Sequence, residues 1–409
     1  MFGHAPHIER FTVASARRQQ LRSLFVSVPF SGIEAYFHNL ETALADSGGF
    51  DSTWLYIGWD LVERGSAIPL LSNNWTIRAS LACRSRIRSL EAAQGVFDVA
   101  LFNSIVPLLG LSGFMRRTPT VLTVDATPAL LDAYGSWYGH DPGGVERLVS
   151  WFGDAMHARR AFRSAKRILA WSPLVRDSLV SDYGVEPGRI LVQPPGVDLQ
   201  RWAGGPHGSL RELRAPSART GILFVGRDFY RKGGDLLFEL ACLPEFADCE
   251  FHFVTSWHRP PNCPENVHIH NDVLPGSDAL IALYQAAHIF ALPTRADFYP
   301  TNACCEAMAM GLPVITSRVG GMEYLLDGDE GGFAIPPDDP SSLMDRLRAL
   351  IGNPALCEQF GRRNRRFAET HFDLNATLRF TTNVLAEAAR GIPAARQEPV
   401  PAGVVGLRV

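Results

Sequence analysis

The chain has 409 residues, of which 46% are hydrophobic and 20% are charged. This length predicts two or three domains, and the composition excludes a disordered or fibrous chain. The formal net charge of -3 provides no bulk attraction to nucleic acid or to an anionic membrane, so we expect no nucleic-acid partner.

The cysteines and the N-terminal segment bear on the cellular compartment. The seven cysteines include no Cys-x-x-Cys pair, so we expect neither a disulfide framework nor a zinc site. Residues 1–20 lack the apolar core of a secretory signal, and no segment is long and apolar enough to span a membrane. These features predict a cytoplasmic protein, for which peripheral contact with the inner face of the membrane is allowed but not indicated.

Short apolar runs alternate with helical patterns in the first half of the chain. A strand at Leu24–Val28 precedes a helix whose apolar face repeats at Ile33, Phe37, Leu40 and Leu44. Further strands are predicted at Trp54–Ile57, Val96–Phe102, Thr120–Val124, Arg167–Trp171 and Ile190–Gln193. Such alternation favours a parallel sheet covered by helices.

The same alternation returns after a stretch rich in glycine and proline between Asp198 and Ala218. Strands are predicted at Gly221–Val225, Phe251–Thr255, Val267–His270, Ile289–Pro293, Val314–Thr316 and Phe333–Ile335. Helices are predicted at Asp235–Leu243, Asp278–Ala287, Ser341–Ile351 and Leu374–Ala389. A second doubly wound domain therefore follows the first.

These patterns predict a domain organisation. We expect an N-terminal domain over residues 1–200, a linker over 201–218 and a C-terminal domain over 219–372. A helix over 373–392 is expected to pack back on the N-terminal domain, and a tail over 393–409 to be disordered. Ligands of such domains bind at the carboxyl ends of strands, beside helix N-termini, so residues there are the candidates for function.

Two candidate segments follow strands of the first half. Ser31 and Gly32 lie between a strand and a helix, a geometry suited to a phosphate but equally to an ordinary helix start. Asp125 directly follows the strand Thr120–Val124. Its carboxylate can bind a ligand, or it can cap the following turn, and the residues leave both readings open.

The segment from Gly221 to Asp235 combines a strand, a glycine turn and cations. Gly226 ends the strand, Arg227 and Lys232 follow, and further glycines open a helix. Cations at this position can neutralise an anionic group such as a diphosphate. Lys232 is one of only two lysines among 39 basic residues, which indicates a specific need for a compact ammonium group.

The stretch Phe290–Gly332 is the richest in chemistry. A loop after the strand leads into a helix that begins near Ala303, with Thr301 or Asn302 as its cap. Backbone N–H groups and the positive dipole end at Thr301, Asn302 and Ala303 would suit a phosphate. Glu306 follows in the helix, where its carboxylate can accept two hydrogen bonds from a vicinal diol such as a ribose.

This stretch resembles the donor site of retaining glycosyltransferases of family 4, which have the GT-B fold. The matching positions are Glu306, Ala307–Ala309, Gly311, Pro313, Val314, Gly320, Gly321 and Glu323. The resemblance implies that Glu306 binds the ribose hydroxyls and that Arg227 and Lys232 hold the donor diphosphate. It also implies that Gly32 contacts the donor from the N-terminal domain.

The chain departs from the family pattern at two positions. The family usually has seven residues between its two acids, whereas position 298 is Phe and Asp297 leaves eight residues before Glu306. Asp297 is therefore expected to contact donor-sugar hydroxyls through a slightly different loop. Many family members have a histidine near the reacting sugar where this chain has Asp125, so the resemblance implies that Asp125 orients a donor hydroxyl or positions the acceptor, unless it only caps the following turn.

The resemblance implies an α/β chain of GT-B fold, with two Rossmann-like doubly wound domains facing a central cleft. It implies transfer of a sugar from a nucleoside-diphosphate sugar to an unidentified glycan, lipid-linked or small-molecule acceptor, with retention at the anomeric carbon and with neither cofactor nor metal. Two alternatives stay open. One is a catalytically silent sugar-nucleotide-binding partner, and the other is an epimerase or phosphorylase on the same fold.

Overall fold

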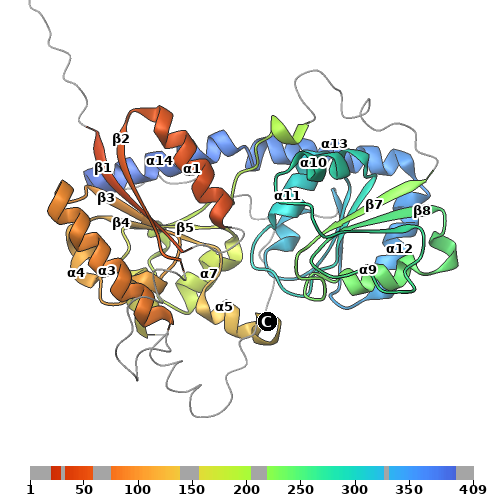
Figure 1. Ribbon diagram of the computed structural model, residues 1–409, viewed down its shortest axis with the longest axis horizontal. Helices are drawn as coiled ribbons and strands as arrows, with labels where there is room; N and C mark the ends of the chain where they lie inside the picture. The colour runs from red at the N-terminus through yellow and green to blue at the C-terminus, as the bar shows by residue number, and fades with distance from the viewer. Residues whose placement is uncertain are drawn as a thin grey trace, which may run out of the picture.

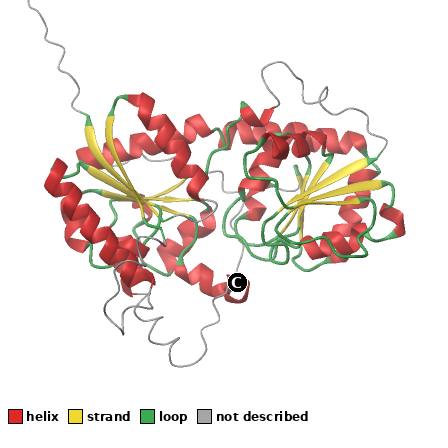
Figure 2. Cartoon of the chain, in the orientation of Figure 1, coloured by secondary structure: helices red, strands yellow, loops and turns green. Residues whose placement is uncertain are grey.

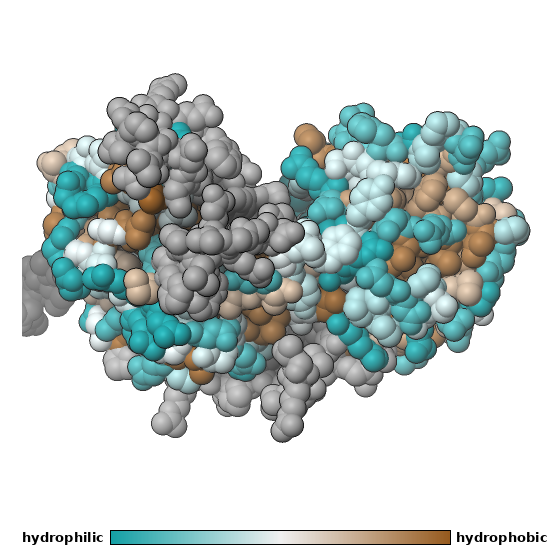
Figure 3. Space-filling model, turned by 90° about the horizontal axis from the view of Figure 1, so that it is seen from below, coloured by the Kyte–Doolittle hydropathy of each residue, from teal (hydrophilic) through white to brown (hydrophobic). Residues whose placement is uncertain are grey.

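The structure is a computed structural model of the chain, and it describes residues 20–28, 33–58, 75–138, 156–203, 219–326 and 331–392. Two lobes are visible in the ribbon and in the space-filling view from below (Figures 1 and 3). Each lobe is built around one parallel sheet of six strands, which lies between helices (Figure 2).

The N-terminal sheet has the strand order β2-β1-β3-β4-β5-β6. Its strands are β1 (Leu21–Ser27), β2 (Phe50–Tyr56), β3 (Val99–Phe102), β4 (Thr120–Val124), β5 (Arg167–Ala170) and β6 (Ile190–Val192). Alternate residues of β1 enter different cores, Leu24 and Val26 on one face and Phe25 on the other. Both faces are therefore covered, as expected for strands with continuous apolar runs.

Helices cover both faces of this sheet. They are α1 (Ile33–Ser47), α3 (Trp75–Gln94), α4 (Ser112–Arg117), α5 (Pro128–Ala133) and α7 (Pro173–Ser181), with 3₁₀ turns η1 (Val106–Leu108), η2 (Gly135–Tyr138) and η3 (Pro187–Arg189). The face that holds Phe25 is also covered by the last helix of the chain, α14 (Leu374–Arg390), through Leu378, Val384 and Leu385. This helix starts beside the C-terminal lobe and crosses to the N-terminal one (Figure 1).

The C-terminal sheet has the order β12-β11-β10-β7-β8-β9. Its strands are β7 (Thr220–Val225), β8 (Cys249–Val254), β9 (Val267–His270), β10 (Ile289–Leu292), β11 (Val314–Ser317) and β12 (Gly332–Ile335). The helices are α9 (Gly234–Ala241), α10 (Asp278–Ala286), α11 (Asn302–Ala309), α12 (Pro340–Ile351) and α13 (Pro354–His371), with 3₁₀ turns η4 (Arg201–Ala203), η5 (Pro244–Phe246) and η6 (Met322–Leu325).

The strand order locates the point at which ligands bind in such sheets. The chain leaves β7 toward β8 and β9 on one side and later returns to pair β10 on the other side. This reversal opens a crevice outside the carboxyl ends of β7 and β10, which is the usual ligand position in open α/β sheets. The residues after β7 and β10 are the two segments that carry Lys232 and Asp297.

The predicted α/β architecture of two parallel, doubly wound sheets is confirmed. Boundaries differ by a few residues; for example, β3 begins at Val99 rather than at Val96, whose side chain is exposed. No helix among the described residues is long and apolar enough to cross a membrane. The same residues include no group of three or more His, Cys, Asp or Glu side chains placed to hold a metal ion.

Candidate nucleotide-sugar site

The Lys232 side chain extends into the crevice across Gly226, which has no side chain to block it. Gly226 follows β7, and a Cβ added there would lie 2.9 Å from Cβ of Lys232 and 3.0 Å from its Cγ. The absent side chain therefore leaves room for the methylene stem of Lys232 against the strand end. The Lys232 side chain is only 12% exposed.

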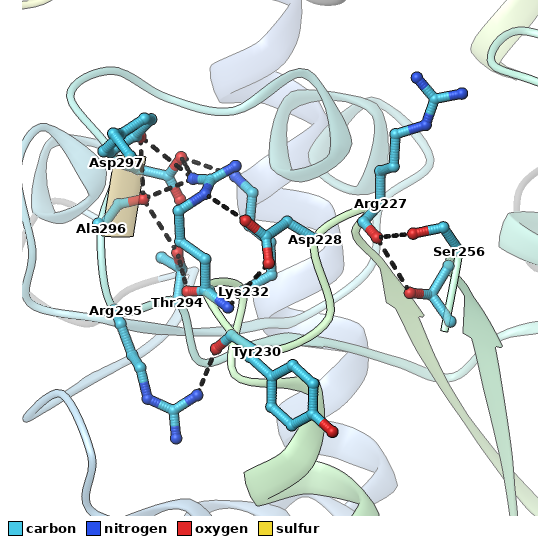
Figure 4. A network of polar contacts seen from close by, with 12 residues as sticks. Arg227, Asp228, Tyr230, Lys232, Ser256, Thr294, Arg295, Ala296 and Asp297 are labelled. Atoms are coloured by element: carbon cyan, nitrogen blue, oxygen red, sulfur yellow. Dashed lines mark hydrogen bonds and ion pairs between the residues drawn. The ribbon is translucent and has the colours of Figure 1, made fainter. Parts of the chain in front are cut away.

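Lys232 and Asp297 form a buried ion pair. Nζ of Lys232 lies 2.6 Å from Oδ1 of Asp297, whose side chain is 6% exposed. Thr294 donates its hydroxyl to the other carboxylate oxygen, Oδ2, at 2.6 Å (Figure 4). Within the described residues Asp297 accepts only one of the three ammonium protons of Lys232, so two donors remain for an anion.

Arg231 adds a second cation to this pair. Its Nη1 lies 3.3 Å from Oδ1 of Asp297 and donates to the carbonyl of Ala296 at 2.8 Å. On its solvent side Nε of Arg231 pairs with Asp228 at 3.1 Å. The loop that carries Asp297 is therefore fastened to the turn that carries Lys232 by two adjacent cations.

Arg227 does not join this network. Its side chain is exposed and extends away from Lys232 and Asp297, whereas its backbone carbonyl accepts hydrogen bonds from Ser256 and Thr255 (Figure 4). The structure thus places one of the two predicted phosphate-binding cations in the crevice and the other on its rim.

The helix start after β10 has free donors. Thr301 is the cap of α11, because its hydroxyl accepts a hydrogen bond from the backbone N–H of Cys304 at 3.4 Å. Asn302 and Ala303 are the first two residues of the helix and are partly exposed. The first N–H groups of a helix lack intrahelical partners, so this end offers donors and positive partial charge beside the Lys232–Asp297 pair.

Glu306 lies one turn further along α11, in a site that favours its neutral form. Tyr284 of α10 donates its hydroxyl to Oε2 of Glu306 at 3.1 Å. Burial raises the pKa of Glu306 to about 8, and the hydrogen bond from Tyr284 opposes this shift only in part. The carboxyl group is therefore mostly protonated at neutral pH while no ligand contacts it.

Asp125 lies at the carboxyl end of β4, facing the C-terminal domain. Burial raises its pKa to about 6, and its charge contributes to the raised pKa of Tyr299 across the interface. Its Oδ1 accepts a hydrogen bond from the N–H of Ala126, but the cap of α5 is Thr127. Asp125 thus bonds to the following turn without capping the helix. Gly32 lies outside the described residues.

Phe298 explains why the acid is displaced by one residue from the family position. Its side chain is 3% exposed and packs in a core of the N-terminal domain, 5.0 Å from the ring of Tyr138 and 5.4 Å from that of Tyr134. Ser172 donates its hydroxyl to the Phe298 carbonyl at 2.6 Å. Position 298 is therefore used to join the domains, and the preceding residue directs its carboxylate to Lys232.

The backbone of Gly320 packs directly against the loop that carries Asp297. This residue has φ 57, and a Cβ there would lie 1.6 Å from the carbonyl oxygen of Asp297. The close backbone approach expected at Gly320-Gly321 is therefore an approach to the loop that carries Asp297 and Phe298.

Several residues of the site were absent from the sequence-based set. Arg231 and Thr294 contact Asp297 directly. Across the domain interface, Nη1 of Arg231 donates to the hydroxyl of Tyr138 at 3.1 Å. Arg231 is adjacent to Lys232 in the sequence and shares its charge, which was an available signal. Nothing in the sequence indicated Tyr138, because its contact spans 93 positions of the chain.

We expect Tyr138→Phe to loosen this interface slightly. The variant keeps the ring on Phe298 but loses the hydroxyl, which donates to the carbonyl of Ala296 at 3.3 Å and accepts from Arg231. The loss of one such group typically costs about 1 kcal/mol of stability. Urea denaturation checks this value, and a variant as stable as the wild type would show that the hydroxyl contributes nothing.

The comparisons with known proteins identify glycosyltransferase sequence in both halves of the chain. Residues 30–201 match the model of Glycosyltransferase Family 4, and residues 219–353 match that of Glycosyl transferases group 1. D-inositol 3-phosphate glycosyltransferase 2 of Catenulispora acidiphila is 28% identical over 284 residues, which are 65% of this chain. The match spans 64% of that relative's own length.

Two solved structures show the same fold. Sucrose-phosphate synthase from Thermosynechococcus elongatus superposes with a TM-score of 0.69 at 17% identity, covering 91% of this chain and 100% of that one. HepE of Anabaena in complex with UDP-glucose gives a TM-score of 0.64 at 15% identity, with 90% of this chain and 100% of that chain covered. The fold is therefore GT-B, as the sequence predicts.

The two matched models lie one on each domain and together cover most of the chain. The crevice outside β7 and β10 holds the lysine, the acid and the helix start that the resemblance led us to expect there. The chain belongs to the family 4 glycosyltransferases.

Proposed function

We propose that the chain transfers a sugar from a nucleoside-diphosphate sugar to an acceptor, with retention at the anomeric carbon. The observation that carries this proposal is the buried Lys232–Asp297 pair, 2.6 Å apart, at the strand-order reversal and beside the start of α11. A diphosphate in the crevice would receive hydrogen bonds from the remaining Lys232 protons and from the free N–H groups of the helix.

Lys232, the start of α11 and Asp297 have separate roles in the proposed transfer. The glycosidic bond from the sugar to the diphosphate breaks while a bond to the acceptor oxygen forms, and the departing diphosphate gains negative charge. Lys232 and the start of α11 stabilise that charge, and the diphosphate oxygen accepts the proton that the acceptor hydroxyl loses. Asp297 holds the ammonium of Lys232 in place and faces the donor sugar.

Glu306 anchors the ribose in this proposal. Two vicinal hydroxyls donate to its carboxylate, while Tyr284 continues to donate to Oε2. Arg227 lies on the rim and reaches the diphosphate by turning its exposed side chain inward. We assign no metal to the reaction, because the cations and helix N–H groups can neutralise the leaving group.

Other proteins guide the choice of substrates to test. The Anabaena HepE structure contains UDP-glucose, and the Catenulispora relative is named for D-inositol 3-phosphate. We propose a sugar nucleotide as the donor, leave the acceptor class open among glycans, lipid-linked and small molecules, and place the activity in the cytoplasm. D-inositol 3-phosphate is the first acceptor to offer.

A thermal-shift screen tests the donor proposal. UDP, GDP, ADP and their sugars are added to the wild type and to Glu306→Ala, with Arg366→Ala as the exposed control on α13. We expect one nucleotide family to raise Tm by several degrees in the wild type and in the control, but not in Glu306→Ala. No shift with any nucleotide would contradict the donor proposal and would indicate a degenerate donor site.

Addition of EDTA tests the proposal that sugar transfer needs no metal ion. We expect the rate of sugar transfer in the presence of EDTA to equal the rate without it, because no step depends on a metal ion. A loss of activity that is restored by Mg²⁺ or Mn²⁺ would contradict the proposal.

A further inference from the structure

A cavity of about 460 Å³ opens on the N-terminal domain away from the candidate donor site. Its walls come from the end of α4, the residues before β4 and β5, η3 and the end of α14. Because the strands are parallel, this edge of the sheet carries the amino ends of β4 and β5, whereas Asp125 lies at the opposite edge. The end of α14 lies on the side of the lobe that faces away from the C-terminal domain (Figure 1).

The lining of this cavity is strongly basic. It contains no acidic residue, and its five basic side chains are Arg116, Arg117, Lys166, Arg189 and Arg390. Arg117 pairs with Glu91 at 3.3 Å, and Arg189 lies 3.6 Å from Glu186. Among the described residues, no carboxylate lies within ion-pair distance of the other three. The chain as a whole has a net charge of -3, so this cluster of unpaired cations does not follow from an excess of basic residues in the chain.

A buried arginine next to the lining residue Lys166 also lacks an anionic partner. Arg167 follows Lys166, is 7% exposed, and donates to the carbonyls of Lys166 at 2.9 Å and Ile392 at 3.3 Å. Its Nε has no hydrogen-bond acceptor, and its guanidinium pairs with no carboxylate in the described part of the chain. A buried cation without a counter-ion is costly, and an anion in the cavity would offset this cost.

Helix dipoles explain only part of this arrangement. Arg189 donates to the carbonyls of Arg163 and Ala165, and Arg390 lies in the last turn of α14, where cations are normally favourable. Lys166 is different, because it precedes a strand and its ammonium forms no hydrogen bond or ion pair among the described residues. It is the only lysine of the chain besides Lys232.

A groove lined by apolar residues together with Arg116, Arg160 and His157 adjoins the basic cavity. A second cavity of about 490 Å³ shares Met115, Arg116 and Ser164 with the first and is lined further by Leu108, Leu109 and Met156, whose side chain is 71% exposed. A ligand that places an anionic group among the cations can therefore extend along an apolar surface.

We propose that the basic cavity is a binding site for phosphoryl oxyanions, separate from the donor site. A phosphoryl group carries up to two charges on several oxygens, so it can accept hydrogen bonds from Lys166, Arg116 and Arg390, which approach from different elements. The phosphoryl group belongs either to a soluble phosphorylated ligand or to a lipid headgroup whose apolar part lies in the adjoining groove.

Titration calorimetry with inorganic tripolyphosphate tests the soluble source. It is done in the Lys232→Ala background, so that the donor site does not compete. We expect Lys166→Gln/Arg390→Gln to weaken binding at least about tenfold, since each lost cation removes a charge-assisted hydrogen bond. Arg366→Ala/Arg379→Ala removes two exposed cations elsewhere on α13 and α14 and should leave the affinity within about twofold.

Co-sedimentation with vesicles tests the lipid source. The same variants are mixed with vesicles of phosphatidylcholine, with and without phosphatidylglycerol. Binding that needs phosphatidylglycerol and is lost in Lys166→Gln/Arg390→Gln supports a headgroup in the cavity. The proposal is overturned if neither probe binds, or if the cavity variant and the control variant weaken binding equally. Lys166 and Arg390 are exposed, so we expect circular dichroism to show that the double variant is folded. If the double variant does not fold, Lys166→Gln alone replaces it in both experiments.

Discussion

Lys232→Ala is expected to lower kcat by about 10²- to 10³-fold, the range observed when one donor to a developing negative charge is removed. The structure supports a large effect because the Lys232 side chain is only 12% exposed and its ammonium points into the crevice. The free energy of unfolding should fall by much less than the activation free energy rises. The reason is that Arg231 remains 3.3 Å from Oδ1 of Asp297 and keeps that carboxylate paired. Steady-state kinetics and thermal denaturation of the same preparation check both expectations.

A double variant separates the two roles open to Lys232. If the ammonium only neutralised Asp297, Lys232→Met/Asp297→Asn would remove both charges together and restore most of the activity. If it holds the leaving diphosphate, the double variant stays as slow as Lys232→Met alone, which is the result we expect. Arg379→Ala is the matched control, since this exposed arginine on α14 contacts no residue of the candidate donor site.

Glu306 should make donor binding depend on pH. Its pKa is about 8 in the free protein, whereas ribose hydroxyls that donate hydrogen bonds favour the ionised carboxylate. Binding therefore releases a proton, so the affinity of the wild type should rise as the pH increases from 6 to 8 and level off above that range. Glu306→Gln should bind at least about tenfold more weakly at pH 8, with no such rise. Calorimetric titration at several pH values measures both trends.

The same carboxyl group should also affect stability, with a defined sign. Its pKa is raised from 4.5 to about 8, so the unfolded chain loses the proton at lower pH than the folded one. The group therefore lowers the free energy of unfolding as the pH rises from about 4.5 to 8. Glu306→Gln lacks this penalty and should be more stable than the wild type at pH 8, by on the order of a few kcal/mol, with little difference at pH 4.5. Equal pH profiles of the two proteins would contradict the burial of this group.

The loop from Thr294 to Thr301 shows where sequence reasoning reaches its limit. The predicted strand, helix start and acid are all present, and Thr301 is the cap. The sequence did not indicate, however, that Lys232 and Thr294 hydrogen-bond to the Asp297 carboxylate. The sequence distance between Lys232 and Asp297 is 65 residues, so only the pairing of β7 with β10 reveals that they meet.

The sequence by itself determined the two parallel sheets, the candidate site at the ends of β7 and β10, and the family. These features are local, because strand and helix periodicities, glycine turns and helix caps are set by residues that are neighbours in the chain. Tertiary structure alone decided that Phe298 joins the domains, that Arg231 and Tyr138 support Asp297, and that Arg227 lies on the rim. It also brought Arg116, Lys166 and Arg390 around one cavity. The physical reason is that burial, ion pairing and pKa shifts depend on distances between segments far apart in the chain, which the folded packing establishes.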